Sequence, residues 1–247
     1  MLTNFDICGI IIEKIQASKY ERKYFYMNIK GAIFDLDGTT IDTLFYWDNL
    51  WAKLGKMYLS DSSFRPGLDF EKAVRTITQE ETAHLIHKTF GFGDSGEALY
   101  EMMYQDLLHM FRYEASFKPG AKELLDHLKA RGVKMTIASA SMPGLLKVVF
   151  DRFDLHQYFP KIISCADVGK GKSHPDVFIA AEKYLGTTRD DTWVFEDSFV
   201  ALQTAKNAGF HTVGVYDKHN FGSVGVADVS TIYIGEGESF HRIIEQI

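Results

Sequence analysis

Residues 31–39 read GAIFDLDGT, an apolar run that ends in two carboxylates on alternate positions. The run GAIF (31–34) is short and apolar, which predicts a buried β-strand. Side chains alternate along an extended chain, so Asp35 and Asp37 point the same way at the carboxyl end of this strand. Such close negative charges are costly unless a cation or a phosphate reaction requires them. Alone the pattern is weak, because Asp is common in turns.

Two later segments repeat the arrangement of an apolar strand followed by polar residues. Residues 133–138 (VKMTIA) predict a second strand that is followed by Ser139. Residues 192–195 (TWVF) predict a third, followed by Glu196 and Asp197. Ligands of open α/β sheets bind outside the carboxyl ends of the strands. We therefore predict an α/β fold with a doubly wound parallel sheet, in which these polar residues meet in one crevice.

The charges in this crevice indicate a metal ion and a phosphate. The glycine-rich loop GKGKSHP (169–175) contributes Lys172, which offsets only one of the four carboxylates. A hard divalent cation such as Mg²⁺ suits carboxylate, carbonyl and water oxygens. Lys172, the Ser139 hydroxyl and backbone N–H groups can then bind phosphate oxygens. Asp35 remains as an oxygen nucleophile, with Asp37 beside it as proton donor and acceptor.

These residues, in this order, resemble the four sequence motifs of the haloacid dehalogenase (HAD) superfamily. The stretches GKSHPDVF (171–178) and EDS (196–198) are most similar to the branch that contains β-phosphoglucomutase and phosphoglycolate phosphatase. The resemblance extends from about Asn28 to the C-terminus. It implies a Rossmann-like core, phosphoryl transfer and a requirement for Mg²⁺.

The resemblance also implies a role for each residue of the catalytic set. Asp35 would form an aspartyl-phosphate, and Asp37 would be the general acid and base. Ser139 and the backbone N–H of Ala140 would bind the transferring phosphoryl group. Lys172 would hold the nucleophile and the phosphate together.

The metal ligands implied by the resemblance overlap with this set. Asp35 would coordinate Mg²⁺ together with the backbone carbonyl of Asp37. Asp197 and Glu196 would complete the site. The cofactor that we expect is therefore Mg²⁺.

Between the first two strands the hydrophobic spacing becomes helical. We predict a helical cap domain at 44–116, which resembles the cap of this HAD branch, and a catalytic core at 27–43 and 117–247. A cap that closes over the crevice excludes water and adds groups that contact the substrate. Arg65, on a cap loop, is our candidate for such a contact. We interpret residues 1–26 as a dispensable extension or a misplaced start.

The global properties exclude several classes of protein. The 247 residues carry a formal net charge of −6 and no long basic run, which argues against a nucleic-acid partner. No stretch approaches the length that spans a membrane. Cys8 and Cys165 form no CxxC pair, which favours a reducing, cytoplasmic location. No amphipathic face is left over after core and cap are built, so we expect a monomer whose partner is a small phosphorylated metabolite.

Three functions compete at this point. The first is Mg²⁺-dependent hydrolysis of a small phosphomonoester, such as a sugar phosphate, phosphoglycolate or a nucleotide. The second is a phosphosugar mutase of the β-phosphoglucomutase type, but its relatives place a His early in the first cap helix, where residues 45–48 here read FYWD. The third is a non-catalytic regulator that binds a phosphometabolite. The complete set of catalytic residues argues against it, because an idle site has no need to keep like charges together.

Overall fold

The computed structural model describes residues 28–75, 77–220 and 224–247. The predicted extension at 1–26 lies outside the described residues. Of the helices that the structure describes, none has the length and apolar character needed to cross a membrane.

A six-stranded parallel sheet forms the core, in the order β5-β4-β1-β6-β7-β8. The bounds of its strands are β1 Gly31–Phe34, β4 Lys134–Ser139, β5 Ile162–Ser164, β6 Thr192–Glu196, β7 His211–Val215 and β8 Ile232–Ile234. The chain reverses its direction across the sheet on the two sides of β1, which is the doubly wound arrangement. The predicted fold class is confirmed.

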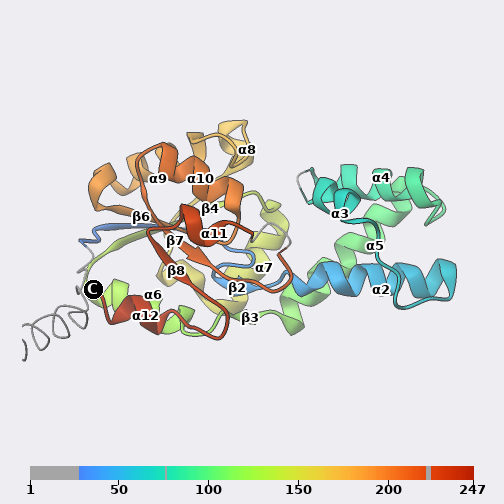
Figure 1. Cartoon of the computed structure of the whole chain (residues 1–247), viewed down its shortest axis with the longest axis horizontal. Coiled ribbons are helices and arrows are strands. Elements are labelled where there is room, and N and C mark those ends of the chain that lie inside the picture. The colour runs from blue at the N-terminus through green and yellow to red at the C-terminus, as the bar shows by residue number, and fades with distance from the viewer. Residues whose placement is uncertain (1–27, 76, 221–223) are drawn as a thin grey trace, which may run out of the picture.

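Helices cover both faces of the sheet (Figure 1). They are α6 Ala121–Ala130, α7 Pro143–Phe153, η2 Leu155–Gln157, α8 Cys165–Val168, α9 Asp176–Leu185, η3 Arg189–Asp191, α10 Phe199–Asn207, α11 Val226–Val229 and α12 His241–Ile244. Successive residues of β1 face opposite sides, as the strand geometry requires. Ala32 and Phe34 belong to the hydrophobic cluster that includes α6, α7 and α12. Ile33 belongs to the cluster that includes α9 and α10. This double burial explains why the strand is apolar throughout.

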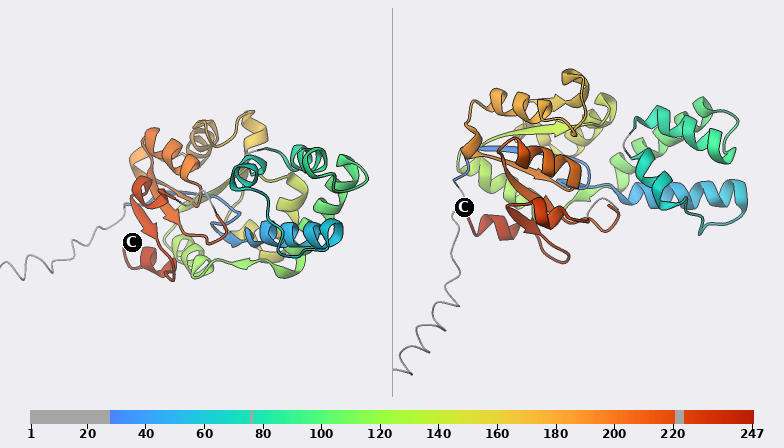
Figure 2. Two further views of the ribbon diagram at one scale, coloured as in Figure 1. Left: turned by 45° about the vertical axis from the view of Figure 1, so that its right-hand side comes forward. Right: turned by 45° about the horizontal axis from the view of Figure 1, so that its top comes forward.

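A helical insertion occupies residues 45–114, between the short strands β2 (Ile41–Asp42) and β3 (Ser116–Phe117). It comprises α2 Phe45–Leu59, α3 Leu68–Val74, α4 Gln79–Phe90, α5 Gly96–His109 and the π-helix η1 Met110–Glu114. Strands β2 and β3 pair antiparallel, so the two connections to the core lie side by side. Figure 2 shows the insertion projecting from the end of the core where these strands lie. It falls within the segment 44–116 that the sequence predicts as a cap.

One predicted strand is shorter than its sequence suggests. The apolar run at 161–166 predicts a strand, but β5 ends at Ser164 and Cys165 begins helix α8. Ser164 and Asp167 form a capping box: Ser164 Oγ accepts from the Ala166 N–H, and Asp167 Oδ2 accepts from the Ser164 N–H. This capping energy starts a helix where hydrophobicity alone predicts an extended chain. Cys165 is buried.

Candidate active site

The carboxyl ends of β1 and β6 lie next to each other and position Asp35 between them. The Asp35 N–H donates to the Phe195 carbonyl at 2.9 Å. The Asp35 carbonyl accepts from Thr40 Oγ1 at 2.6 Å. Gly38 turns the chain with φ of +77°, and a Cβ at this position would lie 2.8 Å from Asp197 Oδ2. Only glycine satisfies both this backbone angle and this close approach.

Lys172 brings a largely buried positive charge to this edge, because its side chain is only 13% exposed. Its Nζ contacts Asp35 Oδ1 and lies 3.1 Å from Glu196 Oε2. Burial would lower the pKa of Lys172, but the charges of Asp35 and Glu196 outweigh it and raise the pKa. Lys172 therefore stays protonated and balances one of the two carboxylates.

Three carboxylates form a cluster that fits a metal ion. Asp35, Glu196 and Asp197 are all buried, and one oxygen of each lies within 4.8 Å of the others. Burial, together with the charge of Asp35, raises the pKa of Glu196 well above its usual range and that of Asp197 to about 7. When the three groups are ionised, their charge exceeds what Lys172 can balance, and the available ligands are all oxygens. This donor set suits a hard divalent cation such as Mg²⁺.

The side chain of Asp37 points to two hydroxyl groups. Thr43 Oγ1 donates to Asp37 Oδ1 at 3.0 Å, and Ser141 Oγ donates to Asp37 Oδ2. Burial, and secondarily the charge of Asp35, raises the pKa of Asp37 to about 6, although the two hydrogen bonds oppose this shift. A carboxyl with such a pKa can exchange a proton near neutral pH. Among the described residues, its side chain lies outside the cluster of three carboxylates.

The remaining predicted site residues differ in their placement. Ser139 is buried at the end of β4, and its Oγ accepts from the Ser141 N–H at 3.0 Å. Ala140 follows it and is exposed. Arg65 lies on the loop between α2 and α3, where it is exposed and donates to the Phe64 carbonyl at 2.7 Å. In the described part of the chain, no hydrogen bond or ion pair joins Arg65 to the carboxylates.

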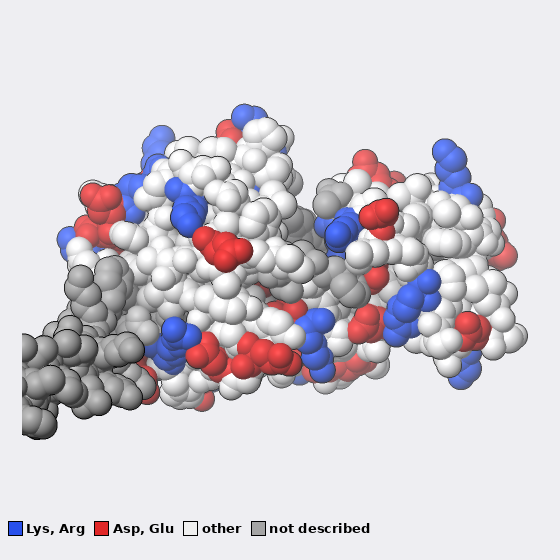
Figure 3. All heavy atoms as spheres, viewed as in Figure 1, with Lys and Arg blue, Asp and Glu red and all other residues white. Residues whose placement is uncertain are grey.

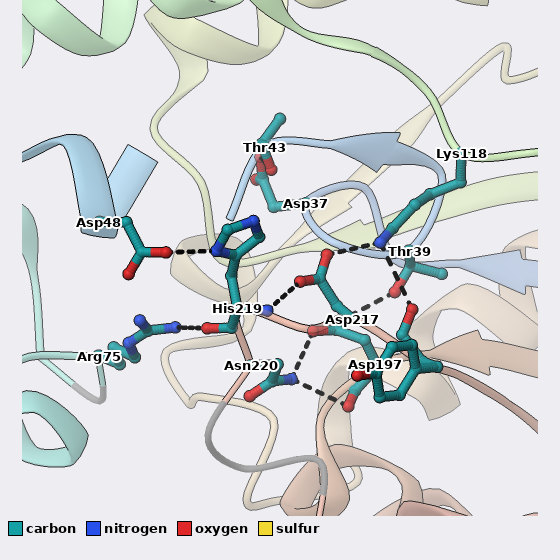
Figure 4. A network of polar contacts seen from close by, with 11 residues as sticks. Asp37, Thr39, Thr43, Asp48, Arg75, Lys118, Asp197, Asp217, His219 and Asn220 are labelled. Atoms are coloured by element: carbon teal, nitrogen blue, oxygen red, sulfur yellow. Dashed lines mark hydrogen bonds and ion pairs between the residues drawn. The ribbon is translucent and has the colours of Figure 1, made fainter. Parts of the chain in front are cut away.

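Further polar residues around Asp197 are not found by motif analysis (Figure 4). Thr39 Oγ1 donates to Asp197 Oδ1 at 3.1 Å. Asn220 Nδ2 donates to Asp197 Oδ2 at 2.6 Å and to the Asp197 carbonyl at 3.0 Å. The only sequence signal for Asn220 is its position shortly after β7, because polar residues at strand ends mark this edge of the sheet.

The surface has no single sign of charge on the face seen in Figure 3. Basic and acidic side chains are interspersed over both the core and the helical insertion. A recess separates these two parts at the upper edge of the view.

Comparisons with known proteins agree with this geometry. A family model described as haloacid dehalogenase-like hydrolase matches residues 29–209. A phosphorylated carbohydrates phosphatase from Thermotoga maritima is 20% identical over 220 residues, which cover 89% of this chain and 100% of the relative. A β-phosphoglucomutase from Bacillus subtilis is 28% identical over 199 residues, which cover 76% of this chain and 83% of the relative. Among solved structures, a HAD hydrolase of family IA, variant 3, from Entamoeba histolytica has a TM-score of 0.69 at 24% identity, over 88% of this chain and 97% of that one.

Proposed function

Because the chain belongs to the haloacid dehalogenase-like hydrolase family, we propose that it is a Mg²⁺-dependent phosphatase acting through an aspartyl-phosphate on Asp35. The family match confirms the predicted family and the prediction that the chain is an enzyme of the hydrolase class. We further propose that the substrate is a small phosphomonoester of the sugar phosphate, phosphoglycolate or nucleotide type.

One observation carries this proposal: Lys172 lies between Asp35 and Glu196, with Asp197 completing the carboxylate cluster. The ammonium group orients the Asp35 carboxylate while leaving negative charge for a cation to balance. A phosphate monoester is itself anionic and reacts slowly without catalysis, so its charge must be neutralised before a carboxylate can attack it. Lys172 would supply part of that neutralisation, and a bound Mg²⁺, held by Asp35, Glu196, Asp197 and the Asp37 carbonyl, would supply the rest.

In the first half-reaction, an oxygen of Asp35 would form a bond to phosphorus as the bond from phosphorus to the substrate oxygen breaks. Asp37, in its protonated form, would give its proton to the departing oxygen. The Ser139 hydroxyl and the Ala140 N–H would donate to the oxygens of the phosphoryl group in transfer. The product alcohol then leaves, and Asp35 carries the phosphoryl group.

In the second half-reaction, the ionised Asp37 would remove a proton from water as that water attacks phosphorus. The bond from phosphorus to Asp35 breaks, inorganic phosphate leaves, and Asp35 returns to its carboxylate form. The raised pKa of Asp37, about 6, suits both roles because the group can hold or release a proton near neutral pH.

The helical insertion would act as the cap that covers the site and selects the substrate. Arg65 remains our proposed contact to an anionic or polyhydroxyl substrate, because it is exposed on an insertion loop. A cytoplasmic location and a monomeric state remain predictions.

The mutase alternative is disfavoured by the start of helix α2. Mutase relatives place a His in this region, which here reads FYWD (45–48); Trp47 within it is buried, with the guanidinium of Arg75 5.2 Å from its ring centroid. An indole in this position packs and cannot shuttle a proton to a second sugar hydroxyl. A regulator that only binds a phosphometabolite would need none of the catalytic carboxylates, so their presence argues against this alternative.

Phosphate release from a panel of sugar, glycolyl and nucleoside monophosphates, measured with Mg²⁺ and again with EDTA, tests the proposal. We expect release from one or a few compounds that EDTA abolishes. Release that persists in EDTA would overturn the metal requirement. Conversion of glucose 1-phosphate to its 6-isomer without phosphate release would establish the mutase instead. If neither activity were found but a phosphorylated compound raised the melting temperature, the regulator would be favoured.

A further inference from the structure

The residues that directly follow β7 contact both the active site and the helical insertion. We call residues 216–220 the bridging loop. At its start, Asp217 Oδ2 accepts from Lys118 Nζ at 2.5 Å, and both side chains are buried. Lys118 directly follows β3, on the segment that returns from the insertion. A buried ion pair is costly to break, so the start of the bridging loop is held against this return segment.

In the middle of the loop, His219 contacts the insertion from two sides (Figure 4). Its Nδ1 lies 2.5 Å from Asp48 Oδ2, in the first turn of α2. Its carbonyl accepts from Arg75 Nη1 at 2.7 Å, where Arg75 follows the last residue of α3. The His219 N–H donates to Asp217 Oδ1 at 2.7 Å. This bond joins His219 to the carboxylate that pairs with Lys118. The loop is therefore joined to the first turn of α2 and to the end of α3.

At its end, the loop holds Asp197 through Asn220. The amide of Asn220 donates to Oδ2 and to the backbone carbonyl of Asp197, while Thr39 donates to Oδ1. Both carboxylate oxygens of Asp197 are thus oriented by neighbours. Groups that orient a metal ligand in this way strongly affect the affinity for the metal.

We propose that Asn220 is a positioning residue for Asp197 and that the bridging loop couples this position to the helical insertion through His219. The inference rests on the proposed function, because it takes Asp197 as a metal ligand. When Asp48 and Arg75 hold His219, Asn220 orients Asp197 for the cation; when those contacts are lost, this orientation is relaxed. By thermodynamic linkage, a cation on Asp197 favours the arrangement in which the insertion contacts the loop.

Two substitutions of opposite charge distinguish this coupling from simple electrostatics. Asp48→Leu removes a negative charge and Arg75→Met removes a positive charge near the site. Through charge alone, the first would weaken cation binding and the second would strengthen it. Through the bridging loop, both would weaken it, because each removes one of the contacts to His219.

The experiment is a titration of the full chain with Mn²⁺ alone, in the absence of substrate, with free Mn²⁺ followed by electron paramagnetic resonance. We expect Asn220→Ala to weaken binding by about 10-fold to 100-fold. Asp48→Leu, Arg75→Met and His219→Ala should each weaken it by about 5-fold or more. Lys218→Ala, an exposed position on the same loop, is the matched control and should not weaken it.

Circular dichroism and the melting temperature in EDTA establish which variants are folded. Arg75 also pairs with Glu71, so Arg75→Met is the variant at most risk of misfolding. If it unfolds, His219→Ala, which removes the contact to Asp48, decides the coupling. At saturating Mg²⁺, the phosphatase rate of Asn220→Ala should return to within a few-fold of wild type, since positioning affects affinity first.

The outcomes separate this inference from the proposed function. Wild-type protein that binds no Mn²⁺ would overturn the metal site, and the inference with it. Wild-type binding with unchanged affinity in folded Asn220→Ala would overturn the positioning role alone. Weakened binding in Asn220→Ala with unchanged affinity in folded His219→Ala and Arg75→Met would overturn the coupling to the insertion.

Discussion

The ammonium group of Lys172, in the turn before α9, lies 3.1 Å from Oε2 of Glu196 at the end of β6, although the two residues are 24 positions apart. The same ammonium contacts Asp35, so one largely buried cation balances the charge of two buried carboxylates. Its protonation is secured by those carboxylates, whose charges raise its pKa against the opposing effect of burial. Removal of this cation should therefore affect both catalysis and stability.

Lys172→Met should lower the rate of phosphate release by about 10²–10³-fold, as loss of one group that stabilises transition-state charge does. It should also destabilise the folded protein by about 3–5 kcal/mol, because two buried carboxylates lose their counterion. Rates at saturating substrate and urea unfolding measure the two effects. Lys170→Met, which alters an exposed pair with Asp176, is the control and should change neither. A Lys172→Met variant with the wild-type rate would exclude a role in charge stabilisation.

Asp35→Asn and Asp37→Asn should have different effects on turnover. The amide of Asn cannot serve as the nucleophile, so Asp35→Asn should abolish turnover and leave no phosphorylated protein after acid quench. Asp37→Asn should lower turnover by about 10²–10⁴-fold, as loss of a general acid and base does. Single-turnover assays with ³²P-labelled substrate measure both. Full activity of folded Asp35→Asn would show that the nucleophile is another residue.

The metal-free protein should lose stability as the pH rises. The pKa of Asp197 is raised from 3.8 to about 7 in the fold, and that of Glu196 is raised as well, so the folded state binds protons more tightly than the unfolded chain. Their contribution to stability is present below the unfolded pKa and is lost as the pH rises through the folded pKa. In EDTA, we therefore expect the melting temperature to fall between about pH 4 and pH 7, relative to that of Asp197→Asn.

Mg²⁺ should reverse this loss, because a cation between the carboxylates favours their ionised form. The gain in melting temperature on adding Mg²⁺ should be larger at pH 8 than at pH 5, and Asp197→Asn should show little gain at either pH. Differential scanning calorimetry at the two pH values measures it. If Mg²⁺ raised the melting temperatures of wild type and Asp197→Asn equally at both pH values, the cation would bind at a site that does not include Asp197.

Thr43→Val should move the basic limb of the pH profile of kcat/KM to higher pH, because kcat/KM reports the first half-reaction, in which Asp37 acts in its protonated form. The Thr43 hydroxyl donates to Asp37 Oδ1, and this bond lowers the pKa of Asp37. Its loss favours the protonated carboxyl, so Asp37 should ionise at a higher pH. Profiles of kcat/KM for wild type and Thr43→Val test the shift. Thr136→Val removes a buried hydroxyl that bonds to the Lys161 carbonyl, and it should leave the basic limb unchanged. If the profiles of Thr43→Val and wild type coincided, the Thr43 hydroxyl would have no effect on the pKa of Asp37.

Local pattern was sufficient to predict the sheet and the residues at its edge. The run at 31–34 is apolar because β1 is buried on both faces, and it ends in acidic residues because the carboxyl ends of parallel strands form the binding edge. The same logic led from the sequence to Ser139 and to the pair Glu196 and Asp197. Where a local capping interaction competed with hydrophobicity, as at Ser164, the strand was predicted too long.

What the sequence by itself determined, then, is the doubly wound core and the charged residues that its strand ends bring to one edge, since each depends on neighbours in the chain. Only the tertiary structure decided the contacts that orient those residues. Asn220 and Asp197 are 23 positions apart, and His219 and Asp48 are 171 apart. No periodicity connects such pairs, because their distances depend on how segments that are distant in the sequence pack against one another.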